Sequence, residues 1–241
     1  MISKSQIAEF SAEWQTQELS VAREYVQHVL LDALFQIKGV ESKLAFKGGT
    51  ALRLLRGSPR FSEDLDFTGW VKPFHVGKWI EQAAREAGRA GLDFKMLESN
   101  ETSGGWFALM EAPVYDWPVR IEWNVSLRAQ GKPAPHETVL VSTPLWTPYS
   151  VTALEVDEMV GEKVEALLRR KEPRDFYDIY YLLRARLGIK SIVAAKRRLL
   201  DETGELDVKE VERELKQFLP RNQRAVVKQL RDILTRELER L

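Results

Sequence analysis

The chain has 241 residues, 44% hydrophobic and 30% charged, a composition typical of a folded globular protein rather than a disordered one. Its 36 basic and 36 acidic residues cancel, so a polyanion would have to be bound by a local cluster. The absence of cysteine excludes disulfides, thiolate metal sites and cysteine nucleophiles, and three scattered histidines disfavour a histidine-rich zinc site. No stretch is apolar enough for a membrane span or a signal peptide, so we expect a cytoplasmic protein with no membrane partner.

The first part of the chain predicts helices that alternate with short strands. Helices are expected over 18–38, 50–57 and 74–90, and strands at LAFKGG, at DLDFTG and over 92–98, 105–112 and 118–127. In the last strand Arg120, Glu122 and Asn124 alternate with apolar residues, as on a sheet with one buried face. This order indicates an α+β lobe built on a mixed sheet.

The second part of the chain predicts only helices. Residues 132–150 are rich in proline, which favours a connecting segment, because proline lacks the N–H that a strand ladder needs. Helices are expected over 151–170, 174–187, 190–202, 208–217 and 221–240. We therefore predict a mixed α+β lobe over 1–150 and an all-helical lobe over 151–241.

Two short motifs in the first lobe favour phosphate and metal chemistry. Gly48, Gly49 and Thr50 lie between a predicted strand and a helix, where glycine backbone and helix N–H groups can approach a phosphate. Thr50 can cap that helix or bind a phosphate oxygen. Asp64 and Asp66 follow in a predicted strand and project from one face, which is suited to Mg²⁺. Either motif alone is typical of an ordinary turn; the two in this order are more specific.

The segment KGGTALRLLRGSPRFSEDLDF resembles the first motif of the AbiEii/AbiGii (MenT-like) toxin family of nucleotidyltransferases, in the DNA polymerase β-type superfamily. The resemblance implies that Gly49 and Thr50 hold a nucleoside triphosphate and that the two aspartates bind Mg²⁺ or Mn²⁺. Lys47 and Ser62 fall where this family commonly has lysine and serine. The first lobe would then be a nucleotidyltransferase core.

A third carboxylate on a later strand is usual in this superfamily, and Glu122 is the natural candidate. Its usual role there is to bind metal and to deprotonate the attacking hydroxyl. The alternative is an exposed glutamate that pairs with Arg120. Asp116, in an apparent turn, is a weaker candidate for the third acid.

Lys163 falls on or beside the apolar stripe of the helix predicted over 151–170, so its charge needs a partner. A triphosphate, Glu162, Asp175 or Asp178 could be that partner. The segments EKVEALLRR and RDFYDIY resemble the second signature of the same family. That resemblance implies that the lysine contacts nucleotide phosphates and that an aspartate of RDFYD is required, without indicating which one. The helical lobe would thereby complete the active-site cleft.

Two stretches of the second lobe are basic without acidic residues, and they are the expected contact for RNA. They contain Arg184, Arg186, Lys190, Lys196, Arg197 and Arg198, then Lys216, Arg221, Arg224, Lys228 and Arg231. Ordinary solvated helix faces would have the same composition. The resemblance implies transfer of a nucleoside monophosphate from a nucleoside triphosphate to RNA, tRNA above all. The protein would be the toxin of a toxin–antitoxin or phage-defence pair, with a separate antitoxin. Modification of a protein or small molecule, or non-catalytic GTP binding, are the alternatives.

Overall fold

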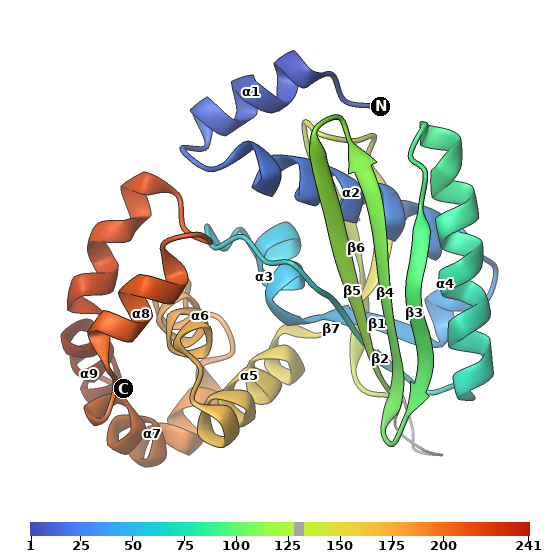
Figure 1. Cartoon of the computed structure of the whole chain (residues 1–241). Helices are drawn as coiled ribbons and strands as arrows, with labels where there is room; N and C mark the ends of the chain where they lie inside the picture. The colour runs from blue at the N-terminus through green and yellow to red at the C-terminus, as the bar shows by residue number, and fades with distance from the viewer. Residues whose placement is uncertain (128–132) are drawn as a thin grey trace. The chain divides into compact units, whose positions relative to one another are not determined.

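A computed structural model describes residues 1–127 and 133–241, and Lys132 at the start of the predicted connecting segment lies outside them. The chain forms two compact units (Figure 1). The sheet unit comprises residues 1–57 and 61–154, and the helical unit comprises 58–60 and 155–241. The predicted lobes divide at 150, whereas the last crossing between the units is at 154/155. Within the described residues no helix is long and apolar enough to cross a membrane.

The sheet unit is built on a mixed sheet with the strand order β3-β4-β5-β2-β1-β7-β6. The strands are β1 (Leu44–Lys47), β2 (Leu65–Gly69), β3 (Lys95–Thr102), β4 (Gly105–Val114), β5 (Trp117–Leu127), β6 (His136–Val141) and β7 (Tyr149–Leu154). β2 pairs parallel with β5 and β1 pairs parallel with β7, while the other neighbours are antiparallel. The mixed sheet confirms the predicted fold class.

Helices α2 (Glu18–Phe35) and α4 (Pro73–Ala87) pack against each other and against the strands, as Figure 1 shows. Phe46, Phe67 and Trp123 come from adjacent strands β1, β2 and β5 and form a continuous aromatic row in the core. Phe35 of α2 contacts this row at Phe67, so the row lies on the helix-covered face of the sheet. The side chains that alternate with these aromatic residues therefore project from the opposite face.

Four shorter helices complete the sheet unit: α1 (Lys4–Glu13), α3 (Gly48–Arg56) and the 3₁₀ turns Val40–Ser42 and Gly88–Ala90. Helix α1 begins with a capping box, in which Ser3 and Gln6 exchange side-chain and backbone hydrogen bonds, and it packs on α2. Helix α3 follows β1 without an intervening loop. It thereby places the GGT residues directly at the end of a buried strand.

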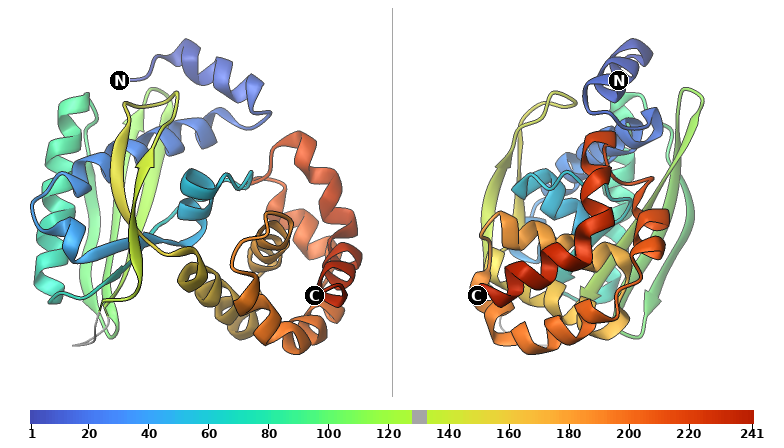
Figure 2. Two further views of the ribbon diagram at one scale, coloured as in Figure 1. Left: turned by 180° about the vertical axis from the view of Figure 1, so that it is seen from behind. Right: turned by 90° about the vertical axis from the view of Figure 1, so that its left-hand side faces the viewer.

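The prediction that 132–150 is a connecting segment is wrong, because it contains β6 and the start of β7 (in yellow tones, facing the viewer in the left-hand view of Figure 2). Its prolines lie just before β6 or between the two strands, where no ladder N–H is needed. The helix predicted from 151 begins instead at Val156. Residues 151–154 are buried strand, in which β-branched Val151 and Thr152 fit well.

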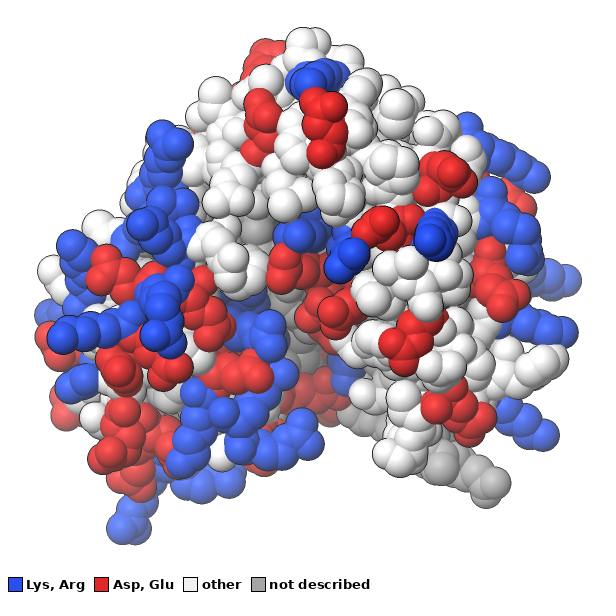
Figure 3. Space-filling view, in the orientation of Figure 1, with Lys and Arg blue, Asp and Glu red and all other residues white. Residues whose placement is uncertain are grey.

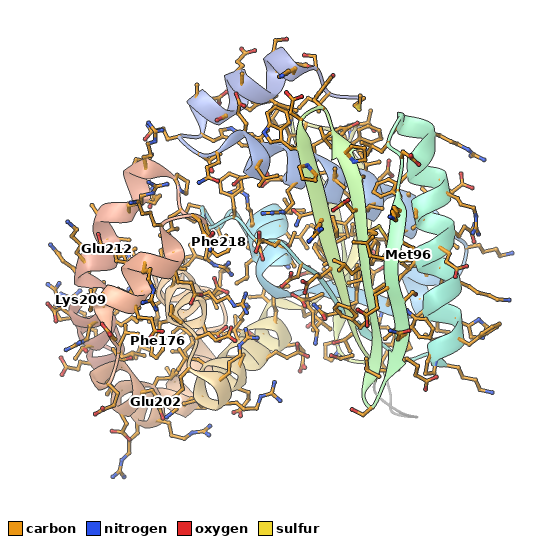
Figure 4. All side chains as sticks on the ribbon, viewed as in Figure 1. Met96, Phe176, Glu202, Lys209, Glu212 and Phe218 are labelled. Carbon is orange, nitrogen blue, oxygen red and sulfur yellow. The ribbon has the colours of Figure 1, made fainter. Side chains whose placement is uncertain are left out.

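The helical unit contains α5 (Val156–Arg170), α6 (Pro173–Arg184), α7 (Ile189–Gly204), α8 (Val208–Leu215), the 3₁₀ segment Arg221–Gln229 and α9 (Leu230–Glu239). α5 packs on α6 and α7, and α9 packs on α7. Phe176, labelled in Figure 4, is buried in this core, whereas Lys209 and Glu212 of α8 are exposed. These elements confirm the predicted helical C-terminal region.

Candidate functional site

The Asp66 carboxylate lies against the backbone of Gly48, at the first residue of α3. A Cβ built on Gly48 would overlap the carboxylate oxygen and lie 2.8 Å from Asp66 Cβ and Cγ. Gly48 also has a φ of 83°, a backbone conformation that residues other than glycine rarely adopt. The glycine is therefore required twice, by its backbone conformation and by the aspartate beside it.

Polar side chains from three strands line up across the sheet at Asp66. In the antiparallel pairing of β1 and β2, Lys47 is opposite Asp66, and in the parallel pairing of β2 and β5, Asn124 is level with Asp66. All three are partly exposed, on the face opposite the aromatic row. Asn124 was not among the predicted site residues, because the register between β2 and β5 is not encoded locally.

Asp64 immediately precedes β2, so only Asp66 of the pair belongs to the strand ladder. Both aspartates are half-buried, and the residue between them, Leu65, is fully buried. Two carboxylates spaced in this way suit Mg²⁺, which commonly takes one or two protein carboxylates and fills its remaining positions with water and substrate phosphate. The donor set of this chain therefore fits a magnesium ion that is held jointly with a nucleotide.

Glu122 lies on the same face of β5 as Asn124, one residue before Trp123, which pairs with Leu65. The register thus places Glu122 level with Asp64, and its side chain is exposed. Across the two described ranges, no three of the Asp, Glu and His side chains are grouped so that they could hold a metal ion. The assignment of Glu122 as a third metal ligand therefore stays a prediction.

Thr50 is buried and donates its hydroxyl hydrogen to the main-chain carbonyl of Asp64. The prediction that Thr50 caps α3 is wrong, because the N-cap is Lys47 and the helix begins at Gly48. The Thr50 hydroxyl instead fixes the backbone at the first aspartate. Ser62, two residues earlier, is half-buried, and its carbonyl accepts a hydrogen bond from Gln27.

In the helical unit, Lys163 and Arg60 both contact the Asp178 carboxylate. Lys163 Nζ lies 2.7 Å from Asp178 Oδ2, and Arg60 binds Asp178 through two parallel hydrogen bonds of 2.8 and 2.9 Å. All three side chains are buried. The structure thus supplies the partner that a lysine beside an apolar stripe requires. Arg60 was not predicted, because its neighbours Pro59 and Phe61 do not indicate which carboxylate it meets.

Burial alone would raise the pKa of Asp178, but Arg60 and then Lys163 outweigh it and hold the pKa at about 2. Asp178 is therefore ionised at any physiological pH. The pKa of Arg60, which burial would lower, is raised by the same carboxylate. The lysine ammonium keeps further N–H donors beyond its ion pair, and these could serve a phosphate oxygen.

Asp175 occupies a different environment from Asp178. It is fully buried, and its carboxylate accepts two hydrogen bonds of 2.7 Å from Arg170, at the end of α5. This pair ties the start of α6 to the end of α5. Asp178, which contacts Lys163 directly, is thus the RDFYD aspartate associated with the lysine, and Asp175 serves the helix connection.

The two basic stretches are partly neutralised inside the helical unit. Arg184 lies 3.6 Å from Glu237 and Arg198 lies 3.3 Å from Glu165. Lys196, Arg224 and Arg231 donate to main-chain carbonyls of the same unit. The other six are exposed: Arg186, Lys190, Arg197, Lys216, Arg221 and Lys228. Figure 3 shows basic and acidic side chains intermixed over this unit, so a basic surface is less concentrated than the sequence indicates.

A family model described as nucleotidyl transferase AbiEii toxin, type IV toxin–antitoxin system, matches residues 29–239. A family of that description implies a nucleotide substrate and an antitoxin partner. No curated protein sequence is a significant match to this chain.

Two solved structures share the fold at low sequence identity. MenT4, a nucleotidyltransferase toxin from Mycobacterium tuberculosis H37Rv, is 17% identical with a TM-score of 0.69, covering 100% of this chain and 91% of its own. JHP933 from Helicobacter pylori is also 17% identical, with a TM-score of 0.58, covering 93% of this chain and 95% of its own. The chain therefore belongs to the AbiEii family, the nucleotidyltransferase toxins of type IV toxin–antitoxin systems.

Proposed function

We propose that this nucleotidyltransferase depends on Mg²⁺ held by Asp64 and Asp66. It transfers the nucleoside monophosphate of a nucleoside triphosphate to the 3′ hydroxyl of an RNA and releases pyrophosphate, with tRNA as the favoured acceptor. The observation that carries the proposal is the Asp66 carboxylate, which lies against Gly48 at the start of α3. The Asp66 carboxylate and the N-terminus of α3 are thereby brought together.

In this proposal each residue of the sheet unit has a defined task. Asp64 and Asp66 supply the metal-binding oxygens, and Thr50 fixes the backbone from which Asp64 projects. The amides of Gly48 and Gly49 begin α3, where the N–H groups of a helix favour an anion such as a phosphate. Bound magnesium would neutralise charge on the transferred phosphoryl group.

Lys47 is opposite Asp66 in the sheet and is the cation of the sheet unit that the family motif places beside the glycines. In the helical unit, Asp178 and Arg60 fix the position of Lys163, which stays the lysine predicted to contact nucleotide phosphates. Asp178 therefore acts in this proposal as a positioning residue for Lys163.

The RNA acceptor is supported by the exposed cations of the helical unit, because a phosphate backbone is attracted by local positive charge even when the whole protein is neutral. MenT4 is likewise described as a nucleotidyltransferase toxin. A protein hydroxyl or a small molecule would be an alternative acceptor for the same chemistry, and it needs no basic surface.

The proposal is tested by incubating the purified protein with each α-³²P-labelled nucleoside triphosphate, Mg²⁺, and either total RNA or total protein. We expect label in RNA of tRNA size, at its 3′ end, and loss of labelling with Asp66→Asn or with EDTA. Asp93→Asn, an exposed aspartate after the second 3₁₀ turn, is the matched control and should label normally. Label in protein alone would refute the RNA acceptor, and full activity of Asp66→Asn would refute the metal role.

A further inference from the structure

The backbone that leads into the aspartate pair is held by side chains at consecutive residues. Gln27 Nε2 donates to the carbonyl of Ser62 at 3.0 Å and to the carbonyl of Glu63 at 3.1 Å. Thr50 donates to the next carbonyl, that of Asp64. Every carbonyl from residue 62 to residue 64 thus accepts a hydrogen bond from a side chain.

These bonds replace the ladder that the segment lacks. Residues 62–64 lie outside helix and strand. The side chains of Gln27 and Thr50 therefore supply the donors that a regular ladder supplies elsewhere. Gln27 lies on the buried side of helix α2 and is only 2% exposed. Arg23, one turn earlier on α2, adds an ion pair of 2.6 Å with Glu63.

Glutamine suits this position because its amide nitrogen carries two N–H groups, and the two carbonyls take one each. Glutamate cannot donate when ionised, and methionine has a similar length with no donor. Asparagine is one methylene shorter, so it cannot span the same distance from α2. Position 27 therefore requires a side chain as long as glutamine whose terminal nitrogen carries two hydrogens.

We propose that Gln27 is a positioning residue of the metal site: it fixes the backbone of residues 62 and 63 and so orients the Asp64 and Asp66 carboxylates. The inference rests on the proposed metal role of these aspartates. Gln27 lies outside residues 29–239, which the family model matches. Its two hydrogen bonds go to the main chain of Ser62 and Glu63 and not to the KGGT motif.

The test compares Gln27→Met with the matched control Gln36→Met, which breaks the exposed 2.7 Å bond from Gln36 to Asp32 at the C-terminal end of α2. Mn²⁺ binding is measured by the electron paramagnetic resonance signal of the unbound ion, and amide hydrogen exchange is measured over residues 62–66. We expect Gln27→Met to weaken Mn²⁺ binding about tenfold or more, as for other groups that orient metal ligands. Exchange at those amides should rise, whereas Gln36→Met should change neither.

If Gln27 served only to pair buried polar groups of the core, Gln27→Met would have a lower melting temperature but an unchanged Mn²⁺ affinity in the folded protein. That result would overturn the inference. If Gln27→Met fails to fold, Gln27→Asn takes its place with the same expected results. Wild-type protein that binds no Mn²⁺, either alone or with a nucleoside triphosphate present, would instead contradict the proposed function itself, so the two failures are distinguishable.

Discussion

Asp66 packs against Gly48, and its carboxylate occupies the space where a side chain on Gly48 would project. Gly48 begins α3 and Asp66 lies in β2, opposite Lys47 at the end of β1. The GGT and DLD motifs are thus parts of a single structure, because the first provides the space that the second fills.

Gly48→Ala should inactivate the enzyme, because the new methyl group would overlap the Asp66 carboxylate and the residue would have to keep a φ of 83°. The backbone strain alone costs roughly 1–2 kcal/mol of stability. Gly39→Ala is the matched control: its φ is 94°, but nothing lies within 4 Å of the added Cβ. Both variants should unfold at lower urea concentration, and only Gly48→Ala should lose nucleotide transfer. Equal loss of transfer in both would assign the effect to stability.

The regular alternation of the residues from 118 to 127 made β5 predictable, and the helical spacing of the C-terminal third made its helices predictable. The prolines of 132–150 predict a connection and hide strands β6 and β7, although these prolines lie outside the strand ladders. Proline removes a ladder donor only at the residue that bears it, and it favours extended backbone at the residue before it. A segment can therefore be rich in proline and still contribute strands.

Some residues of the site can be identified from their neighbours in sequence, whereas others depend on the tertiary structure. Lys163 was identifiable because a lysine among apolar residues needs a partner, yet the sequence left four partners open and the structure supplies Asp178. Arg60 and Asn124 were missed since their roles depend on which segments meet: Arg60 reaches Asp178, and Asn124 is level with Asp66 only through the β2–β5 register.

Asn124→Leu should weaken the metal site, because it replaces the polar neighbour of Asp66 on β5 with an apolar side chain of similar size. We expect kcat/KM for nucleotide transfer to fall about tenfold or more, the usual effect of losing a polar neighbour of a metal ligand. Ser126→Ala is the control, two residues along the same face and level with Thr68. An unchanged kcat/KM and Mg²⁺ requirement in Asn124→Leu would show that register with Asp66 has no functional consequence.

Glu122→Gln tests the predicted third carboxylate. If Glu122 deprotonates the attacking hydroxyl, the substitution should lower kcat by about 10²–10⁴-fold, the range of general base catalysis, with little change in stability because the side chain is exposed. Glu101→Gln, an exposed glutamate of β3, provides the comparison. Single-turnover rates of nucleotide transfer are measured for both variants and the wild type at one pH. A kcat within a few-fold of wild type would remove Glu122 from the site.

Asp178→Asn should destabilise the helical unit by about 3–5 kcal/mol at neutral pH, because Arg60 and Lys163 would remain buried without a counter-charge. Asp175→Asn should cost less, since its partner Arg170 has a side chain that is 38% exposed. The pKa of Asp178 is lowered from 3.8 to about 2, so its contribution is complete above pH 4 and is lost as the pH falls through 2. Urea unfolding at pH 7 and at pH 3 should show the gap between wild type and Asp178→Asn narrowing at the lower pH.

His28 should make the sheet unit sensitive to mild acid. Its ring is buried and lies 2.7 Å from the Tyr149 hydroxyl; burial and then the positive charge of Arg53 lower its pKa from 6.5 to about 3. In the unfolded chain the ring takes up a proton near pH 6.5, whereas the folded protein does not until about pH 3, so between these values stability falls as the pH falls. The slope is at most about 1.4 kcal/mol per pH unit.

His28→Gln retains a polar partner for Tyr149 and has no titrating ring. We expect it to be less stable than wild type at pH 7.5 and to lose less stability on acidification, so that the gap narrows by about 2 kcal/mol by pH 5. His75→Gln, at an exposed histidine of α4, should follow the wild-type curve throughout. Free energies of unfolding from urea titrations at pH 7.5, 6.5, 5.8 and 5.0 provide the measurement. Parallel curves for wild type and His28→Gln would mean that the imidazole is protonated within the folded protein, because only then would folding leave its proton uptake unchanged.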